Sequence, residues 1–144
     1  MLNFRKFFNK SEEEKDIEST LNKLPKHHRS LVDGYTYKFH NGNTLDGDSN
    51  HVGYMDPQKK EIAMAGSWKY PKEWIFLHEI AHRVWDNLVG EEKRKEWEEI
   101  VKDTKNKQNQ SADELFCHAY AANYSSHKIK IHHHPKWIEF IKNI

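Results

Sequence analysis

Two histidines and a glutamate stand close together in the segment "WIFLHEIAHRVWD", residues 74–86. On an α-helix, residues four positions apart lie on one face, a turn apart, so His78 and His82 would project side by side. Imidazole nitrogens placed in this way can bind one Zn²⁺ ion at about 2.0–2.1 Å. Glu79 would lie at the edge of that face, where its carboxylate can take a proton from a water molecule on the metal. The pattern therefore predicts a zinc site with its own general base. The competing interpretation is an amphipathic helix that carries two histidines and no metal.

A zinc site of this type needs a third protein ligand. The downstream residues that could supply it are Asp113, Glu114, His118, His127 and His132 to His134. We favour Glu114, because it lies near the start of an apolar helix and because two histidines alone would bind zinc poorly. A competing role is open to it, since Ser111 and Glu114 also fit a capping box, in which the glutamate folds back on the helix start. One carboxylate cannot easily do both.

Three further polar residues lie near these positions. Asp86 follows His82 by one helical turn, so it could orient the imidazole or simply be a solvated acid at the helix end. His118 follows Glu114 by one turn and could contact the site or the substrate, or be exposed. Cys117 is expected to point off the face that carries Glu114 and to behave as a small buried hydrophobe.

Two helices must position these groups. The first is expected over about residues 71–89, because Pro71 suits a first helical position and Gly90 suits a stop. Its opposite face is apolar enough to be buried and consists of Leu77, Ile80, Ala81, Val84 and Leu88. The second helix is expected over about residues 112–125 and carries Glu114.

The rest of the chain predicts a small sheet and further helices. A helix over about residues 11–24 begins with a capping box of Ser11 and Glu14 and ends at Pro25. The remaining elements are a strand in "YTYKFHNGN", two short strands in "HVGYMDPQKKEIAMAG" that end at Gly66, a charged helix in "EEKRKEWEEIVKD" and a last helix in "PKWIEFIKNI". This order predicts an α+β fold with the helices packed on one face of the sheet.

Composition narrows the classes of function. The length of 144 residues fits a single domain over residues 1–144 with a real core. The formal net charge is +1, with no basic helix interleaved with aromatics, so we expect no nucleic acid as partner. There is no apolar run of about 18 residues, so we expect no membrane span. There is no recognisable signal peptide, so we expect a cytoplasmic location, and secretion by another route stays open. The only cysteine, Cys117, excludes an internal disulfide. We expect a monomer.

Four segments resemble, in order, parts of a known family. "GYMDPQKKEIAMAG", "FLHEIAH", "DELFCHAYAANY" and "HPKWIEFIKNI" are similar to the strand pair, the zinc helix, the glutamate helix and the closing helix of the anthrax lethal factor catalytic domain and of the Pro-Pro endopeptidases. The similarity covers roughly residues 51–144. It implies a zincin-like zinc metallopeptidase with His78, His82 and Glu114 as metal ligands and Glu79 as the base.

The sequence departs from this family at two positions. Lys107 stands where the family has a tyrosine that is thought to steady the oxyanion, and His118 stands where relatives tend to carry a second glutamate. We therefore expect a zinc-dependent endopeptidase that hydrolyses a protein or peptide substrate with Glu79 activating the water. Two alternatives stay open. One is a cytoplasmic metalloprotease that cleaves a repressor, and the other is a catalytically decayed module that binds a metal or a partner.

Overall fold

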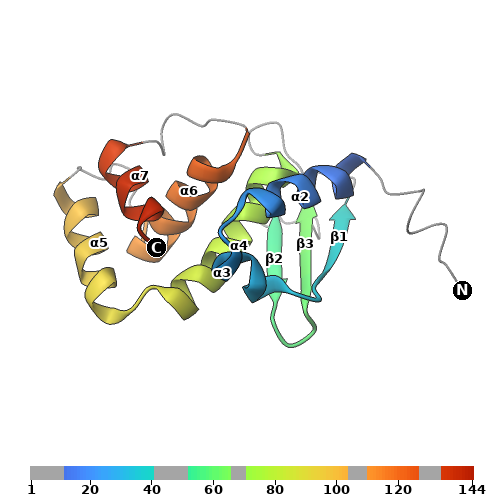
Figure 1. The fold of residues 1–144 in the computed structure, drawn as a ribbon, viewed down its shortest axis with the longest axis horizontal. Coiled ribbons are helices and arrows are strands. Elements are labelled where there is room, and N and C mark those ends of the chain that lie inside the picture. Colours follow the sequence, from blue (N-terminus) through green and yellow to red (C-terminus); the bar gives the residue numbers. More distant parts are fainter. Residues whose placement is uncertain (1–11, 41–51, 66–70, 104–109, 127–133) are drawn as a thin grey trace, which may run out of the picture. The chain divides into compact units, whose positions relative to one another are not determined.

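The computed structural model describes residues 12–40, 52–65, 71–103, 110–126 and 134–144 (Figure 1). Within these ranges the chain forms six α-helices, one 3₁₀ turn and a sheet of three strands. In order they are α2 (Glu12–Lys23), α3 (Lys26–Arg29), η1 (Ser30–Val32), β1 (Thr36–His40), β2 (Gly53–Asp56), β3 (Glu61–Ala65), α4 (Lys72–Leu88), α5 (Glu91–Asp103), α6 (Ala112–Tyr124) and α7 (Pro135–Lys142). The predicted α+β class is confirmed.

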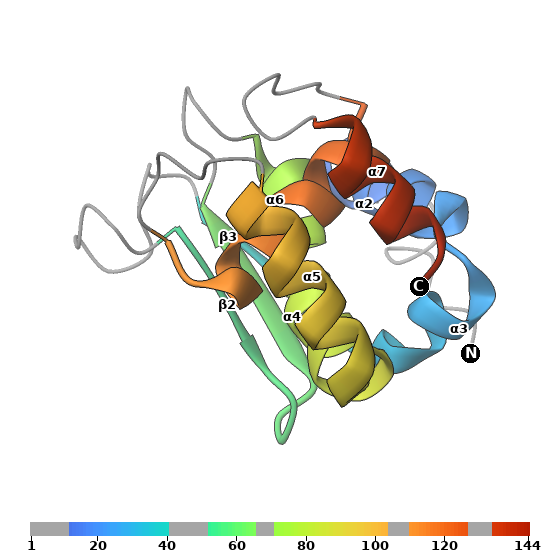
Figure 2. The same ribbon diagram turned by 90° about the vertical axis from the view of Figure 1, so that its left-hand side faces the viewer.

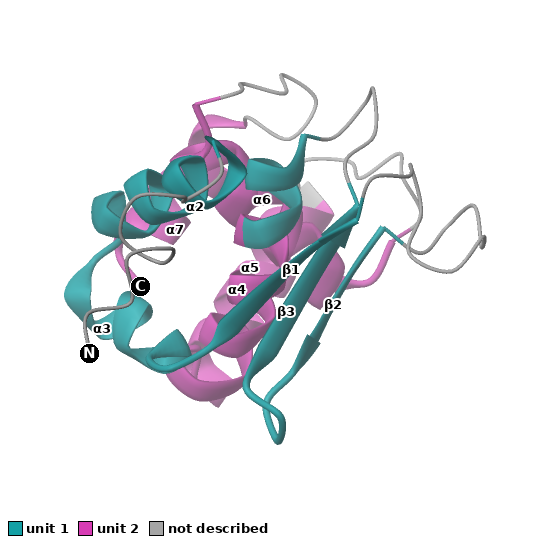
Figure 3. Ribbon diagram, turned by 90° about the vertical axis from the view of Figure 1, so that its right-hand side faces the viewer, with its two compact units in different colours: residues 1–76 teal, residues 77–144 magenta. Residues whose placement is uncertain are grey.

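The chain divides into two compact units, residues 1–76 and residues 77–144, which we call unit 1 and unit 2 (Figure 3). The boundary falls inside α4, between Phe76 and Leu77. Unit 1 contains the sheet, and unit 2 contains most of α4 together with α5, α6 and α7. The expectation of one domain over residues 1–144, with its helices on one face of the sheet, stays a prediction.

The sheet of unit 1 has the strand order β1-β3-β2 (Figure 3). The two predicted strands around Asp56 and Pro57 form an antiparallel pair, in which Met55 lies opposite Ile62. Their connection is held by Asp56, whose Oδ1 accepts hydrogen bonds from the backbone N–H groups of Gln58 at 3.0 Å and Lys59 at 3.2 Å. The third strand, β1, is parallel to β3, a pairing that the sequence did not predict.

Helix α2 is joined to the first turn of α4 within unit 1. The Thr20 hydroxyl donates a hydrogen bond of 2.7 Å to the carboxylate of Glu73, and Lys72 pairs with Glu13 at 2.6 Å. The helix predicted over about residues 11–24 is confirmed by α2, whereas α3 and η1 were not predicted. Ser11 of the predicted capping box, the turn at residues 41–43 and Gly66 lie outside the described residues.

Unit 2 is built around the indole of Trp97 in α5. Its ring centroid lies 5.9 Å from that of Phe116 in α6, and 5.6 Å and 5.1 Å from those of Trp137 and Phe140 in α7. Helices α5, α6 and α7 accordingly contact one another (Figure 2). The indole N–H also donates a hydrogen bond of 2.7 Å to the carbonyl of Ala112, the first residue of α6. This contact fixes the start of α6 two residues before Glu114.

The end of α4 is held by a side chain from α5. The Arg94 guanidinium donates hydrogen bonds to the backbone carbonyls of Trp85 at 2.8 Å and Val89 at 2.9 Å, and it lies 4.9 Å from the Trp85 ring. A cation at a helix C-terminus satisfies carbonyls that have no partner within the helix. The Trp85 ring in turn packs against Phe116 of α6 at 5.1 Å. These contacts position α4 and α6, the two helices that carry the candidate site.

In the part of the chain that the structure describes, no helix is long and apolar enough to cross a membrane.

Candidate metal centre

The two histidines project from one side of α4, as their spacing predicts. The predicted apolar residues Leu77, Ile80, Ala81 and Val84 are fully buried, and Leu88 is half-buried. His78 and His82 are half-buried, and their ring centroids lie 5.1 Å apart with the rings nearly perpendicular. The helix predicted over about residues 71–89 is confirmed as Lys72–Leu88, so the local geometry of the pair is the one expected.

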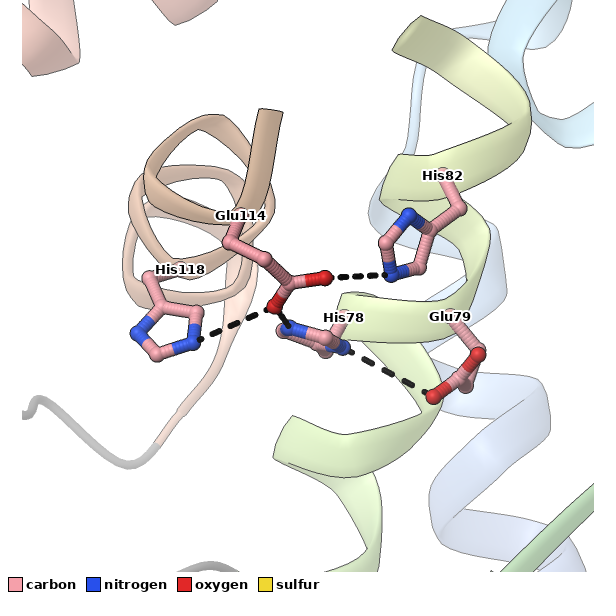
Figure 4. Close-up of polar contacts among 5 residues, drawn as sticks. All are labelled: His78, Glu79, His82, Glu114 and His118. Atoms are coloured by element: carbon pink, nitrogen blue, oxygen red, sulfur yellow. Dashed lines mark hydrogen bonds and ion pairs between the residues drawn. The ribbon is translucent and has the colours of Figure 1, made fainter. Parts of the chain in front are cut away.

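The carboxylate of Glu114 reaches both histidines. Its Oε2 lies 3.1 Å from Nε2 of His78, and its Oε1 lies 3.3 Å from Nε2 of His82 (Figure 4). Ser111 occupies the N-cap of α6, but its side chain makes no capping hydrogen bond among the described residues. Of the two roles open to Glu114, the structure therefore places its carboxylate against the histidines.

These contacts change the charges of the three groups. Burial lowers the pKa of His78, but hydrogen bonds to Glu114 and Glu79 outweigh it and raise the pKa from 6.5 to about 9. The hydrogen bond to Glu114 also raises the pKa of His82, against the effect of burial. Hydrogen bonds from His78 and His82 hold the pKa of Glu114 well below its usual range. The cluster thus stabilises positive charge beside a carboxylate, as a cation site does.

Glu79 lies beside the other ring nitrogen of His78. Its Oε1 is 3.6 Å from Nδ1 of that ring, and its side chain is 12% exposed, so the carboxylate is sheltered and close to the cluster (Figure 4). Asp86 behaves differently. It is exposed, and within the described residues no hydrogen bond or ion pair joins it to His82. Of the two roles left open for Asp86, the structure supports the solvated acid.

Two further residues of α6 lie at the cluster. Nε2 of His118 is 3.8 Å from Oε2 of Glu114, and its ring centroid is 5.1 Å from that of His78 (Figure 4). Cys117 is fully buried, as expected. The expectation that it points off the Glu114 face was wrong, because its sulfur lies within 4.8 Å of ligand nitrogens of His78 and His82. Residues three positions apart differ by only about 60° around a helix. The spacing of Glu114 and Cys117 in the sequence could therefore have predicted that both side chains lie on the same side of α6.

Two groups of side chains in the described residues could hold a metal ion. One is His78, His82 and Cys117, and the other is His78, Glu114 and His118, with the ligand atoms of each group within 4.8 Å of one another. Neither group includes the other candidates Asp113 and His134. His134 instead accepts a hydrogen bond from the backbone N–H of Lys136 at the start of α7. Outside the described residues lie Lys107, His127, His132 and His133.

Comparisons with known proteins found no matching family model, no matching curated protein and no matching solved structure. The similarity to the lethal factor family therefore rests on the quoted segments alone.

Proposed function

We propose that this chain is a zinc-dependent endopeptidase of the zincin-like type, which hydrolyses peptide bonds of a protein substrate. The observation that carries the proposal is the contact of Glu114 with both His78 and His82, made by side chains from two different helices. Two imidazoles and one carboxylate form a ligand set that catalytic zinc sites use, and such sites keep a position open for the reacting groups. These residue types fit zinc, and both groups of described side chains that could hold a metal contain His78, one with His82 and Cys117 and the other with Glu114 and His118.

Each residue then has a defined task. His78, His82 and Glu114 would hold the metal. The chemistry that zinc supplies to such a site is polarisation of the scissile carbonyl and a lower pKa for water. Glu79 takes the proton of the attacking water. It passes this proton to the nitrogen of the leaving amine as the C–N bond breaks. Its place beside the ligand His78 supports this role.

The burial of α4 supports the same proposal. Leu77, Ile80 and Ala81 are fully buried next to the histidines and the glutamate in sequence, so the backbone that carries these three groups is held by packing. Catalytic groups that are fixed before the substrate arrives need little reorganisation in the transition state. A rigid helix is therefore a suitable support for a base that must meet the water in one geometry.

The deciding experiment is Glu79→Gln, with Asp86→Asn as the matched control on the same helix. Glu79 is not among the proposed ligands, so Glu79→Gln should keep one zinc per chain. Peptide hydrolysis should fall by about 10²–10⁴-fold, which is the usual contribution of a general base. Asp86→Asn should keep both metal and activity, because Asp86 is exposed. Metal content is measured by elemental analysis and hydrolysis by a proteome-derived peptide library. Wild-type turnover in Glu79→Gln would remove Glu79 from the mechanism.

A second candidate function is a metal-binding module without catalysis. The observation that favours it is the presence of His118 and Cys117 beside the three proposed ligands, because enough protein ligands are at hand to leave no open position on the metal. Zinc binding without hydrolysis of any peptide in the library would favour this second function over the first.

A further inference from the structure

Helix α6 presents more ligand atoms to the histidines of α4 than a catalytic zinc site needs. Glu114 is in contact with both rings, and the sulfur of Cys117 lies within 4.8 Å of ligand nitrogens of the same two rings. We propose that Cys117 binds, as a thiolate, the metal that His78 and His82 hold, and that this sulfur ligand closes the site. The inference rests on the proposed metal site and adds a mode of regulation to it.

The surroundings of Cys117 separate it from an ordinary buried cysteine. A buried thiol usually packs among apolar groups and is chemically inert. Here the side chain is fully buried yet has two imidazoles as neighbours, and it follows Glu114 by three positions on the same helix. Thiolate and imidazole are the two ligand types most used by zinc in proteins. The combination of His78, His82 and Cys117 is thus a metal-binding set in its own right.

The distances require only a small adjustment. In a tetrahedral zinc site with Zn–N bonds of about 2.0–2.1 Å and a Zn–S bond of about 2.3 Å, the ligand atoms lie about 3.5 Å apart. The three atoms already lie within 4.8 Å of one another. A thiol that coordinates a metal loses its proton, which passes to solvent as the metal–sulfur bond forms.

The sulfur ligand has a chemical consequence for the site. With His78, His82 and Glu114 alone, one position of a tetrahedral metal stays open, as catalysis requires. With Cys117 added, four protein ligands occupy all positions, as in structural zinc sites. The closed form cannot accept a substrate carbonyl or a water, so it is inactive, and release of Cys117 opens it. A thiolate also favours softer metals over Mg²⁺ or Ca²⁺.

The test begins with the wild-type protein loaded with zinc, because Cys117 is the only cysteine of the chain. X-ray absorption at the zinc edge should show one sulfur neighbour at about 2.3 Å in addition to nitrogen and oxygen neighbours. With Co²⁺ in place of zinc, a sulfur-to-cobalt charge-transfer band should appear in the near ultraviolet. Cys117→Ser should lose both signals and should hydrolyse peptides several-fold faster than wild type. Asp113→Asn, a change on the same helix at a residue outside both metal-holding groups, should keep both signals.

The outcomes separate this inference from the proposed peptidase. Metal without a sulfur neighbour in wild type overturns the role of Cys117 and leaves the peptidase standing. A sulfur neighbour together with no hydrolysis by either wild type or Cys117→Ser supports the ligand and overturns the peptidase. Absence of bound metal overturns both. The absorption measurement needs only the wild-type chain, so it decides the question even if Cys117→Ser does not fold.

Discussion

The contact between Glu114 and His78 should make the stability of the metal-free protein depend on pH, and Glu114→Gln tests this. Glutamine keeps the shape of the side chain and removes its charge. In the wild type the pKa of His78 rises from 6.5 to about 9, although burial opposes the rise. The rise from 6.5 to about 9 corresponds to about 3.5 kcal/mol at about 1.4 kcal/mol per pKa unit, which is an upper limit for the contact with Glu114 because Glu79 also raises the pKa of His78. The His78 side chain is 15% exposed and that of Glu114 is 37% exposed, so solvent screening lowers the contribution of the pair below this limit.

The direction of each shift sets the pH window. The pKa of His78 is raised on folding, so its contribution is complete below its ordinary pKa of 6.5 and is lost as the pH rises through about 9. The pKa of Glu114 is lowered on folding, so its contribution is complete above its ordinary value of 4.5 and is lost as the pH falls through the lowered value. Both shifts report the same contact and are not added. Stabilisation by the pair is greatest between these two ordinary values.

The assay is urea unfolding in the presence of a chelator. Glu114→Gln should lower the free energy of unfolding by at most about 3 kcal/mol at about pH 6, and by much less at about pH 9.5, where His78 has largely lost its proton in both proteins. The matched control is Glu99→Gln, because Glu99 is exposed on α5 and should show no such dependence on pH. An equal loss for Glu114→Gln at both pH values would show that packing, and not the ion pair, accounts for the effect.

Two further predictions concern metal binding and the β-hairpin. Zinc should raise the melting temperature of wild type, because a ligand that binds only the folded state stabilises it. His78→Ala should abolish this rise, because His78 belongs to both groups that could hold a metal, and an unchanged rise in this variant would place the zinc elsewhere. Lys60→Gly should raise the free energy of unfolding by up to about 1 kcal/mol, because a φ of 52° is strained for a residue with a side chain. Lys59→Gly, the control one residue earlier, should lower it, and equal effects at both positions would exclude backbone strain as the cause.

The parts of the site that follow from local geometry were predictable from the sequence. The spacing of His78 and His82 determines which face of a helix they share, and Pro71 and Gly90 marked the ends of α4 to within one residue. The contact with Glu114 is different, because it joins two helices distant in the sequence. It could be expected only from the chemical need for a third ligand, and the capping role of the same residue could be set aside only with the structure.

The missed features depend on contacts that periodicity does not record. The parallel pairing of β1 with β3 joins segments separated by β2, and no local pattern specifies it. Helix α3 is only four residues long and too short for an apolar stripe.

The error at Cys117 has a geometric cause. A buried helix face spans 100° or more, so a residue about 60° from Glu114 still faces the same neighbour. The prediction placed the Cys117 thiol on another face of the helix, because it took the face that carries Glu114 to be too narrow.

The charges of the cluster suit the entry of a cation. His78 keeps a proton at neutral pH because its pKa is about 9, and Glu114 stays ionised beside it. A dication that replaces histidine protons leaves the charge of the cluster nearly unchanged, so the carboxylate keeps a positive partner throughout. Because metal and protons would compete for the same nitrogens, the affinity of the proposed zinc site should rise with pH until His78 is deprotonated. The same ion pair that holds α4 to α6 without metal would thus prepare the site for it.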